Sequence, residues 1–408
     1  MKRKLTRWFN KHLSVDAVKM AILFVPLVYL LVKEIRQGKF AWGDFLDVGI
    51  LVSFLLVGVC EVIASILGKW IGSKCEDATK LTEDYGRLCK KYAREKFVLL
   101  RGKKCPVICL CQRKETDASY VFDIRESEER KRYELPEQVA DRSDLLMNAH
   151  QYSVVYNNRN VRLDDLQVEG NRVLLEYSTT MYFDSLVTNR VMDFDWGNGK
   201  TVREVYEPGP FLNSLKESKL SNHLGFNGFV ETKDGKIIFV MRYGKVSIGK
   251  RTLADSIGAS LKTAYCLDED RRFTVDGLDA AIRGEIKDEL KIDINPDEKL
   301  HKGIFAFYRD VVEGGKPQFL FYYKTDWTSA KVEQVFKAAL KEDKKKKRRK
   351  LLTDGKELIF IPRDELISLE LAPGSLKRKN GKAYKMMPSA VAAVQMLREY
   401  LGICECKE

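Results

Sequence analysis

Two apolar segments near the N-terminus constrain this 408-residue chain more than any other feature. Residues of about 15–33 and 46–69 are almost continuously apolar, with few charged interruptions such as Lys19 and Glu61. A helix rises about 1.5 Å per residue and the apolar core of a bilayer is about 30 Å thick. The sequence therefore predicts two transmembrane helices, which form a hairpin within residues 1–72.

The lysines and arginines around these segments predict an orientation. They are more numerous before the first segment and after the second than in the short connection between them. Cytoplasmic loops carry such an excess of basic residues, so we expect both termini to be cytoplasmic and the protein to be a two-span protein of the inner membrane. Glu61 within the second segment has two open interpretations, a polar contact in an oligomer or water path, and a charge tolerated near the interface.

The remainder of the chain predicts an α/β (α+β) fold in three parts. Residues 73–97 have the composition of a charged juxtamembrane helix. Residues 98–215 contain short β-rich runs and predict a linker module. Residues 218–403 alternate strand and helix patterns, and begin with two strands joined at Asp234-Gly235, a dipeptide that suits the positive backbone angles of a tight hairpin turn.

Composition favours an anionic partner without identifying one. The formal net charge is +13, which suits a nucleotide, a nucleic acid or an acidic lipid surface, and equally suits plain solubility. The nine cysteines lack the regular spacing of a disulfide framework, which argues against a stapled secreted fold.

The segment 275–292 carries the clearest chemical pattern. Glu285, Asp288 and Glu289 stand at positions i, i+3 and i+4, so that a helix would place their carboxylates on one face. Such oxygen ligands suit Mg²⁺ or Mn²⁺, which in turn bind phosphate oxygens. The alternative is a solvated acidic stripe that pairs with Lys287 and Lys291.

This segment resembles the Nudix box, written G-x5-E-x7-R-E-U-x-E-E-x-G-U with U aliphatic. Glu285 falls on the glutamate of the R-E pair, and Asp288 and Glu289 fall on the paired acids. The strand-turn-strand that ends at Arg242 is similar to the start of a Nudix domain. The resemblance implies a mixed sheet sandwiched by helices, Glu285, Asp288 and Glu289 as metal ligands, and Glu285 and Glu289 as catalytic groups in an active enzyme.

The box also departs from the family pattern at three positions. Its first glycine falls on Asp270, the arginine of R-E on Gly284, and the last glycine on Lys291. In the family that arginine orients the catalytic glutamate, and Arg283 lies about 100° away around a helix. The damaged box favours a domain that binds a nucleotide without cleaving it, and leaves slow hydrolysis as the alternative.

Two spans followed by a Nudix-like domain resemble the membrane effectors of bacterial cyclic-oligonucleotide antiphage (CBASS) systems. The resemblance implies a homo-oligomeric sensor of a cyclic nucleotide whose spans disrupt the inner membrane in antiviral defence, with no specific nucleic-acid partner. A membrane-anchored, Mg²⁺-dependent Nudix hydrolase of a nucleoside diphosphate derivative is the alternative, and an inert scaffold is a third reading. The residues expected to bind the ligand are Arg242, Lys250, Arg251, Lys262 and Arg309.

Overall fold

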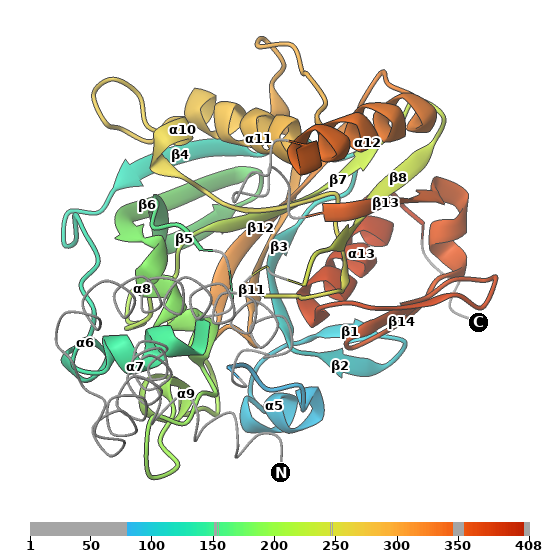
Figure 1. Cartoon of the computed structure of the whole chain (residues 1–408). Helices are drawn as coiled ribbons and strands as arrows, with labels where there is room; N and C mark the ends of the chain where they lie inside the picture. Colours follow the sequence, from blue (N-terminus) through green and yellow to red (C-terminus); the bar gives the residue numbers. More distant parts are fainter. Residues whose placement is uncertain are drawn as a thin grey trace, which may run out of the picture. The chain divides into compact units, whose positions relative to one another are not determined.

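One mixed sheet organises the part of the chain that the computed structural model describes, namely residues 80–150, 153, 155–244, 246, 248–345 and 355–403. Its strands run in the order β13-β8-β7-β12-β11-β3 (Figure 1), and β7 and β12 are parallel while the other neighbours are antiparallel. Two short strands, β9 and β10, pair with β8 and β7. The bounds are β3 (Val107–Gln112), β7 (Gly225–Glu231), β8 (Lys236–Arg242), β9 (Leu253–Ala254), β10 (Ile257–Ser260), β11 (Ile304–Asp310), β12 (Lys316–Lys324) and β13 (Gly355–Pro362).

The turn between β7 and β8 is the hairpin that the sequence predicted. Gly235 has a φ of 73°, and its N–H donates to the carbonyl of Thr232 over 2.9 Å. A residue with a β-carbon is strained at such an angle, which explains the glycine at this point. The prediction of a hairpin here is confirmed.

Helices cover both faces of the sheet. Along β12, Phe319 and Phe321 belong to one hydrophobic core, whereas Leu320 and Tyr322 belong to the other, because successive side chains of a strand point to opposite faces. Buried side chains of α11 and α12 complete the first core and those of α13 the second (Figure 1). The bounds are α11 (Val275–Leu290), α12 (Ser329–Lys345) and α13 (Pro388–Tyr400). This part of the chain is mixed α/β, as predicted.

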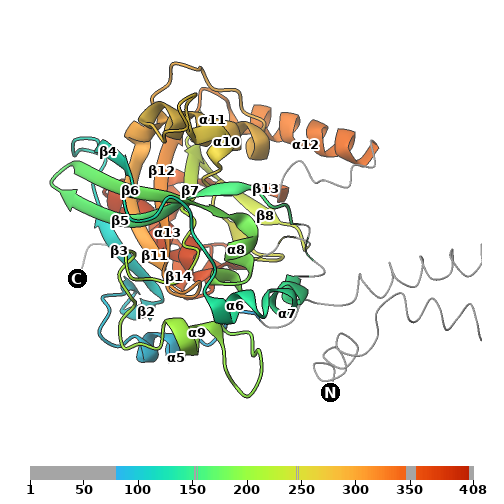
Figure 2. The ribbon, with the colours of Figure 1, turned by 90° about the vertical axis from the view of Figure 1, so that its left-hand side faces the viewer.

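A second sheet lies beside the first and has the order β4-β6-β5. Figure 2 shows β5 and β6 as a long hairpin. Val161 of β5 donates its N–H to the carbonyl of Leu261 over 2.9 Å and accepts from the N–H of Leu224 over 2.8 Å, which ties the hairpin to the end of β10 and the start of β7. The bounds are β4 (Val121–Glu126), β5 (Arg159–Glu169) and β6 (Arg172–Met181).

Segment 98–215, expected as a β-rich module, thus contributes to both sheets, since β3 pairs with β11 and β4–β6 form the second sheet. Of the helix expected over residues 73–97, the described part contains only a short one, α5. The remaining elements are α5 (Tyr85–Lys91), β1 (Val98–Leu100), β2 (Lys103–Cys105), α6 (Glu137–Ala140), α7 (Ser143–Met147), α8 (Tyr182–Leu186), α9 (Val202–Tyr206), α10 (Thr263–Cys266), β14 (Glu370–Ala372), β15 (Ser375–Lys377) and β16 (Ala383–Lys385).

The prediction of a two-span inner-membrane protein requires correction. Among residues 80–403, so far as the structure describes them, no helix is both long and apolar enough to cross a membrane. The two longest, α11 and α12, have 16 and 17 residues and carry many charges. The segments assigned to the spans, 15–33 and 46–69, lie outside the described residues, as does Glu61. We therefore withdraw the transmembrane hairpin, the inner-membrane location with cytoplasmic termini, and the membrane-disrupting antiviral role that depended on them.

Candidate functional site

The acidic segment forms the helix that its spacing predicted. Helix α11 begins after Thr274, whose hydroxyl accepts from the N–H of Gly277 over 3.1 Å, and its buried face includes Ile282, Ile286 and Leu290. An N-terminal hydroxyl of this kind satisfies one of the N–H groups that the first turn leaves unpaired. Helix α11 is therefore anchored against the sheet by its apolar face, which fixes the direction of its acidic face.

The end of α11 explains one of the departures from the Nudix pattern. Lys291, which stands where that pattern has glycine, caps the helix in the left-handed conformation with a φ of 63°. Helices commonly end on a residue in this conformation, and glycine is the residue that adopts it without steric cost. The backbone geometry of the glycine is kept here although the residue is lysine.

Arg283 does not replace the missing arginine of the box. Its guanidinium donates to the backbone carbonyls of Asn295, Pro296 and Glu298 over 3.3, 2.6 and 3.0 Å, so that it faces the segment that follows α11. A side chain added at Gly284 would instead approach the ring of Tyr265. No guanidinium of this helix therefore orients Glu285.

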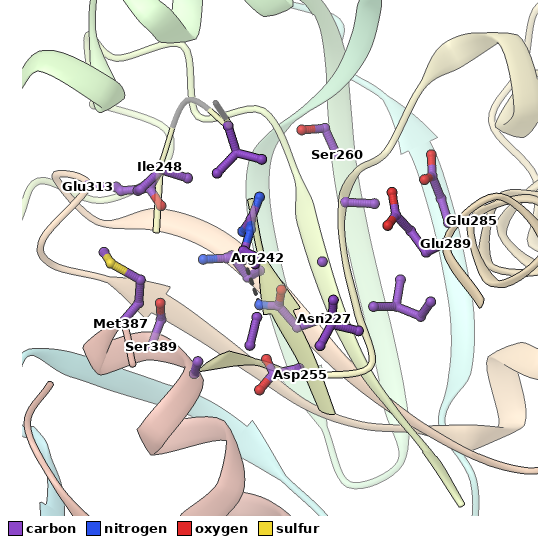
Figure 3. Close-up of a pocket in the computed structure, with 18 of the residues that line it drawn as sticks. Asn227, Arg242, Ile248, Asp255, Ser260, Glu285, Glu289, Glu313, Met387 and Ser389 are labelled. Atoms are coloured by element: carbon purple, nitrogen blue, oxygen red, sulfur yellow. Dashed lines mark hydrogen bonds between the residues drawn. The ribbon is translucent and has the colours of Figure 1, made fainter. Parts of the chain in front are cut away.

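A cavity of about 470 Å³ lies beside α11. Figure 3 shows Glu285 and Glu289 at one end, and Glu313 and Met387 at the other, with Arg242 between them. The cavity is lined by residues of both sheets, of the segments around β9 and β10, and of α11 and α13. It is the place where the acidic helix meets the basic residues of the strands.

An ion pair closes the acidic end of the cavity. The ammonium group of Lys262 donates to the carboxylate of Glu285, whose side chain is only 6% exposed. Burial lowers the pKa of Lys262, but the charge and hydrogen bond of Glu285 outweigh burial, and the pKa is raised overall. Lys262 therefore carries its charge at neutral pH and supplies the positive charge that the acidic face requires.

The predicted Mg²⁺ ligands share this cavity but do not form a ligand set. Glu285, Asp288 and Glu289 all line it. Glu285 is bound by Lys262, and Asp288 accepts a hydrogen bond of 3.4 Å from the hydroxyl of Tyr265. Within the described residues, no three carboxylate, histidine or cysteine side chains are arranged to hold a metal ion. The arrangement does not fit the ion that the acidic helix predicted.

The opposite end of the cavity is basic. Arg190 and Lys316 share the carboxylate of Glu313, at 3.0 and 3.8 Å, and all three side chains are almost fully buried. Burial lowers the pKa of Lys316 to about 8; Arg190 and Arg242 add to the lowering, and Glu313 and Asp310 oppose it. The carboxylates of Glu313 and Asp310 thus lie among three cations, namely Arg190, Arg242 and Lys316.

Two further polar groups line the cavity between its ends. Burial raises the pKa of the Asp255 carboxyl well above its usual value, against the opposing charge of Arg242. The amide of Asn160 is 1% exposed, and neither its oxygen nor its nitrogen has a hydrogen-bond partner in the described part of the chain. Buried polar groups are normally paired, so both residues require an explanation.

The sequence located part of this site. Among the residues predicted to bind the ligand, Arg242 and Lys262 line the cavity, whereas Lys250, Arg251 and Arg309 do not. The guanidinium of Arg309 donates to the carbonyls of Gly315 and Asn213 over 2.9 and 2.7 Å, and therefore holds the backbone together. The prediction of these three as ligand residues is not supported by the geometry of the cavity.

Sequence reasoning missed most of the lining, including the polar residues Asn160, Arg190, Asp255 and Lys316. Asn160 and Arg190 belong to the segment for which the sequence predicted no role. Lys316 opens a strand whose apolar residues identified it only as core. In the sequence, these residues are marked only as polar side chains at the ends of apolar runs. That pattern is too common to identify a binding site.

Comparison with known proteins does not identify the site. No protein-family model matches this chain, and no curated protein matches it. A solved structure, that of DR0079 from Deinococcus radiodurans, aligns with 36% of this chain and 70% of its own, at 13% sequence identity and a TM-score of 0.20. A likeness with so low a TM-score supports no conclusion about fold or function, so the site is interpreted from its own residues.

Proposed function

We propose that this part of the chain is a nucleotide sensor, which binds a phosphate-bearing signal in the cavity and does not hydrolyse it. The observation that carries the proposal is the ion pair between Lys262 and Glu285. A metal-dependent hydrolase of the Nudix type would use the carboxylate at this position for its ion. Here an ammonium group of the chain itself neutralises that carboxylate.

The absence of an orienting arginine supports the same proposal. Position 284 is glycine, and Arg283 is held by three backbone carbonyls on the far side. A general base must be held within hydrogen-bond reach of the proton that it removes. Arg283 does not hold Glu285 in that way, whereas the bond from Lys262 directs this carboxylate to a different partner.

The cations of the cavity support binding of phosphate. Lys262 lies at one end, Arg242 in the middle, and Arg190 with Lys316 at the other end. Hydrogen bonds between such cations and phosphate oxygens are roughly twice as strong as neutral ones. Although carboxylates such as Glu285 and Glu313 accompany them, these cations lie along the whole cavity, and we therefore propose a ligand that carries more than one phosphate.

The test is calorimetric titration of the full-length chain with cyclic dinucleotides, cyclic trinucleotides and nucleoside diphosphate derivatives, with and without Mg²⁺. Each sample is analysed by chromatography afterwards. We expect one cyclic nucleotide to bind without Mg²⁺ and to be recovered intact. Metal-dependent cleavage of any of these compounds would overturn the proposal in favour of hydrolysis.

Two variants make this test specific to the cavity. Arg242→Met removes a cation from the middle of the cavity and should weaken binding by about tenfold or more, because a charge-assisted hydrogen bond is lost. Lys287→Met is the matched control, since Lys287 lies on α11 in an exposed pair with Asp293. Equal affinity of the two variants would show that the ligand binds elsewhere.

A further inference from the structure

Asn160 stands out among the buried and partly buried amides of the described residues. Asn189 donates to Asn222 Oδ1 over 3.0 Å and to the carbonyl of Glu313 over 2.9 Å, and Asn227 donates to Gln318 Oε1 over 2.9 Å. In contrast, neither Oδ1 nor Nδ2 of Asn160 has a hydrogen-bond partner in the described part of the chain, although its side chain is 1% exposed. A buried amide without partners is costly, so its retention points to a partner that is not part of the chain.

Asn160 belongs to the wall of the cavity. Asn160 lies on β5, where its backbone pairs with Thr180 on one side and bridges to Lys262 on the other. Asn160 and Lys262 both line the cavity. The hydroxyl of Thr180 is already bonded to Ser221 and Asp184, over 2.9 and 3.0 Å, so it does not satisfy the amide. Asn160 is therefore the backbone neighbour of Lys262, one of the cations that the proposed function assigns to phosphate.

Aromatic side chains accompany the amide. Tyr156 and Tyr182 line the same cavity, and Tyr182 begins α8 directly after β6, the strand that pairs with Asn160. Aromatic rings in nucleotide sites support the flat faces of bases. An amide offers a donor beside an acceptor, which complements an amino group and an adjacent ring nitrogen, and asparagine commonly binds adenine in this bidentate way.

We infer that Asn160 selects the base of the ligand, and that the base is adenine. Nδ2 donates to a ring nitrogen of adenine while Oδ1 accepts from its amino group. The inference rests on the proposed function, because it assumes that the phosphate of the same ligand is held by the cations of the cavity. The proposed function assigns the phosphate of that ligand, and this inference assigns its base.

The experiment compares three probes on the full-length chain by calorimetry at up to millimolar concentration. They are AMP, purine riboside 5′-monophosphate and ribose 5-phosphate. The second probe differs from AMP only in lacking the amino group, and the third lacks the base. We expect AMP to bind roughly 5- to 150-fold more tightly than the second probe, which is the range for one bidentate amide contact to a base.

Variants of Asn160 then assign the preference to its amide. Asn160→Ala should bind AMP and purine riboside 5′-monophosphate equally, and should bind ribose 5-phosphate as the unmodified chain does. Asn160→Asp, which has nearly the same shape but no donor, should lose most of the preference and guards against a folding defect in the alanine variant. Gln167→Ala is the control, because Gln167 is an amide on the same strand that bonds to Asp165 over 2.9 Å.

The outcomes separate this inference from the proposed function. Binding of all three probes without a preference for AMP, or a preference that survives in Asn160→Ala, overturns the role of Asn160 and leaves phosphate binding intact. Failure of AMP to bind overturns the role of Asn160, whereas the proposed function is decided separately by the titrations with cyclic dinucleotides and trinucleotides. A preference for AMP that disappears in Asn160→Ala and remains in Gln167→Ala supports the inference.

Discussion

The ammonium group of Lys262 and the carboxylate of Glu285 form an ion pair inside the cavity, where Glu285 is almost completely buried and Lys262 partly so. The two residues come from different elements, since Lys262 follows β10 and Glu285 lies in the middle of α11. The pair therefore joins the edge of the sheet to the acidic helix. The contribution of this ion pair to the free energy of unfolding can be measured without any ligand.

Loss of Lys262 should destabilise the fold more than loss of an exposed lysine of the same region. Lys262→Met leaves Glu285 buried without its cation, which costs about 3–5 kcal/mol in a fully buried pair. Because Lys262 is 29% exposed, water compensates in part, and we expect about 1–3 kcal/mol in urea denaturation. The double variant Lys262→Met with Glu285→Gln should recover part of the loss. A single variant as stable as the unmodified chain would contradict the prediction.

The two glycines of α11 should respond in opposite directions to alanine. A β-carbon at Gly277 would lie 2.0 Å from the carbonyl oxygen of Cys266, so Gly277→Ala forces the backbone apart. We expect a loss of about 2–4 kcal/mol in the free energy of unfolding. At Gly284 the nearest atom is 3.6 Å away, and alanine should stabilise the helix by about 0.5–1 kcal/mol. Thermal unfolding of both variants measures the contrast, and a shift of the same sign in both would show that the close approach at Cys266 is not rigid.

Replacement of Lys291 by glycine should stabilise the protein. Lys291 holds a left-handed conformation, which costs a residue with a β-carbon about 1 kcal/mol relative to glycine. After allowance for the greater freedom of glycine in the unfolded chain, we expect a gain of about 0.5 kcal/mol in denaturant unfolding. Lys287→Gly, one turn earlier and within the helix, is the matched control and should lose about 1 kcal/mol. A loss in both variants would be evidence against the left-handed cap.

The parts of this fold that the sequence predicted depend on neighbours in the chain. The Asp234-Gly235 turn and the amphipathic pattern of α11 are local, and both elements form where they were expected. Arg242 was predicted because it ends the hairpin, and Lys262 because it lies in the segment that follows the hairpin. Local patterns do not reveal pairing partners, so the sequence did not predict that β3 joins β11 about 200 residues later.

The parts of the site that were missed or misplaced depend on distant residues. Arg190 and Lys316 approach each other only because both contact Glu313 in the folded chain. Arg309 has the charge expected of a ligand residue, but the carbonyls of Gly315 and Asn213 take its guanidinium. The spacing of residues along the chain predicts neither arrangement. Each depends on which charged side chains and backbone carbonyls the fold brings together.

The buried lysine of the cavity makes stability depend on pH in the alkaline range. Lys316 has a pKa of about 8 in the folded chain, because burial and then Arg190 and Arg242 disfavour its charge. An unfolded lysine has a pKa of about 10.4, so between these values the unfolded chain binds more protons, and stability rises with pH. Relative to Lys316→Met, the unmodified chain should therefore gain up to about 1 kcal/mol per pH unit from pH 8 to pH 10 and little below pH 8.

Urea denaturation of both chains at pH 7, 8, 9 and 10 measures this difference, and the comparison cancels the other groups that titrate in the same range. Lys324→Met is the control, since Lys324 lies on the same strand but is 54% exposed beside Glu115. Its difference from the unmodified chain should not change with pH. If the Lys316→Met difference were equally flat, Lys316 would keep its proton throughout, and Glu313 and Asp310 would outweigh its burial and the two arginines.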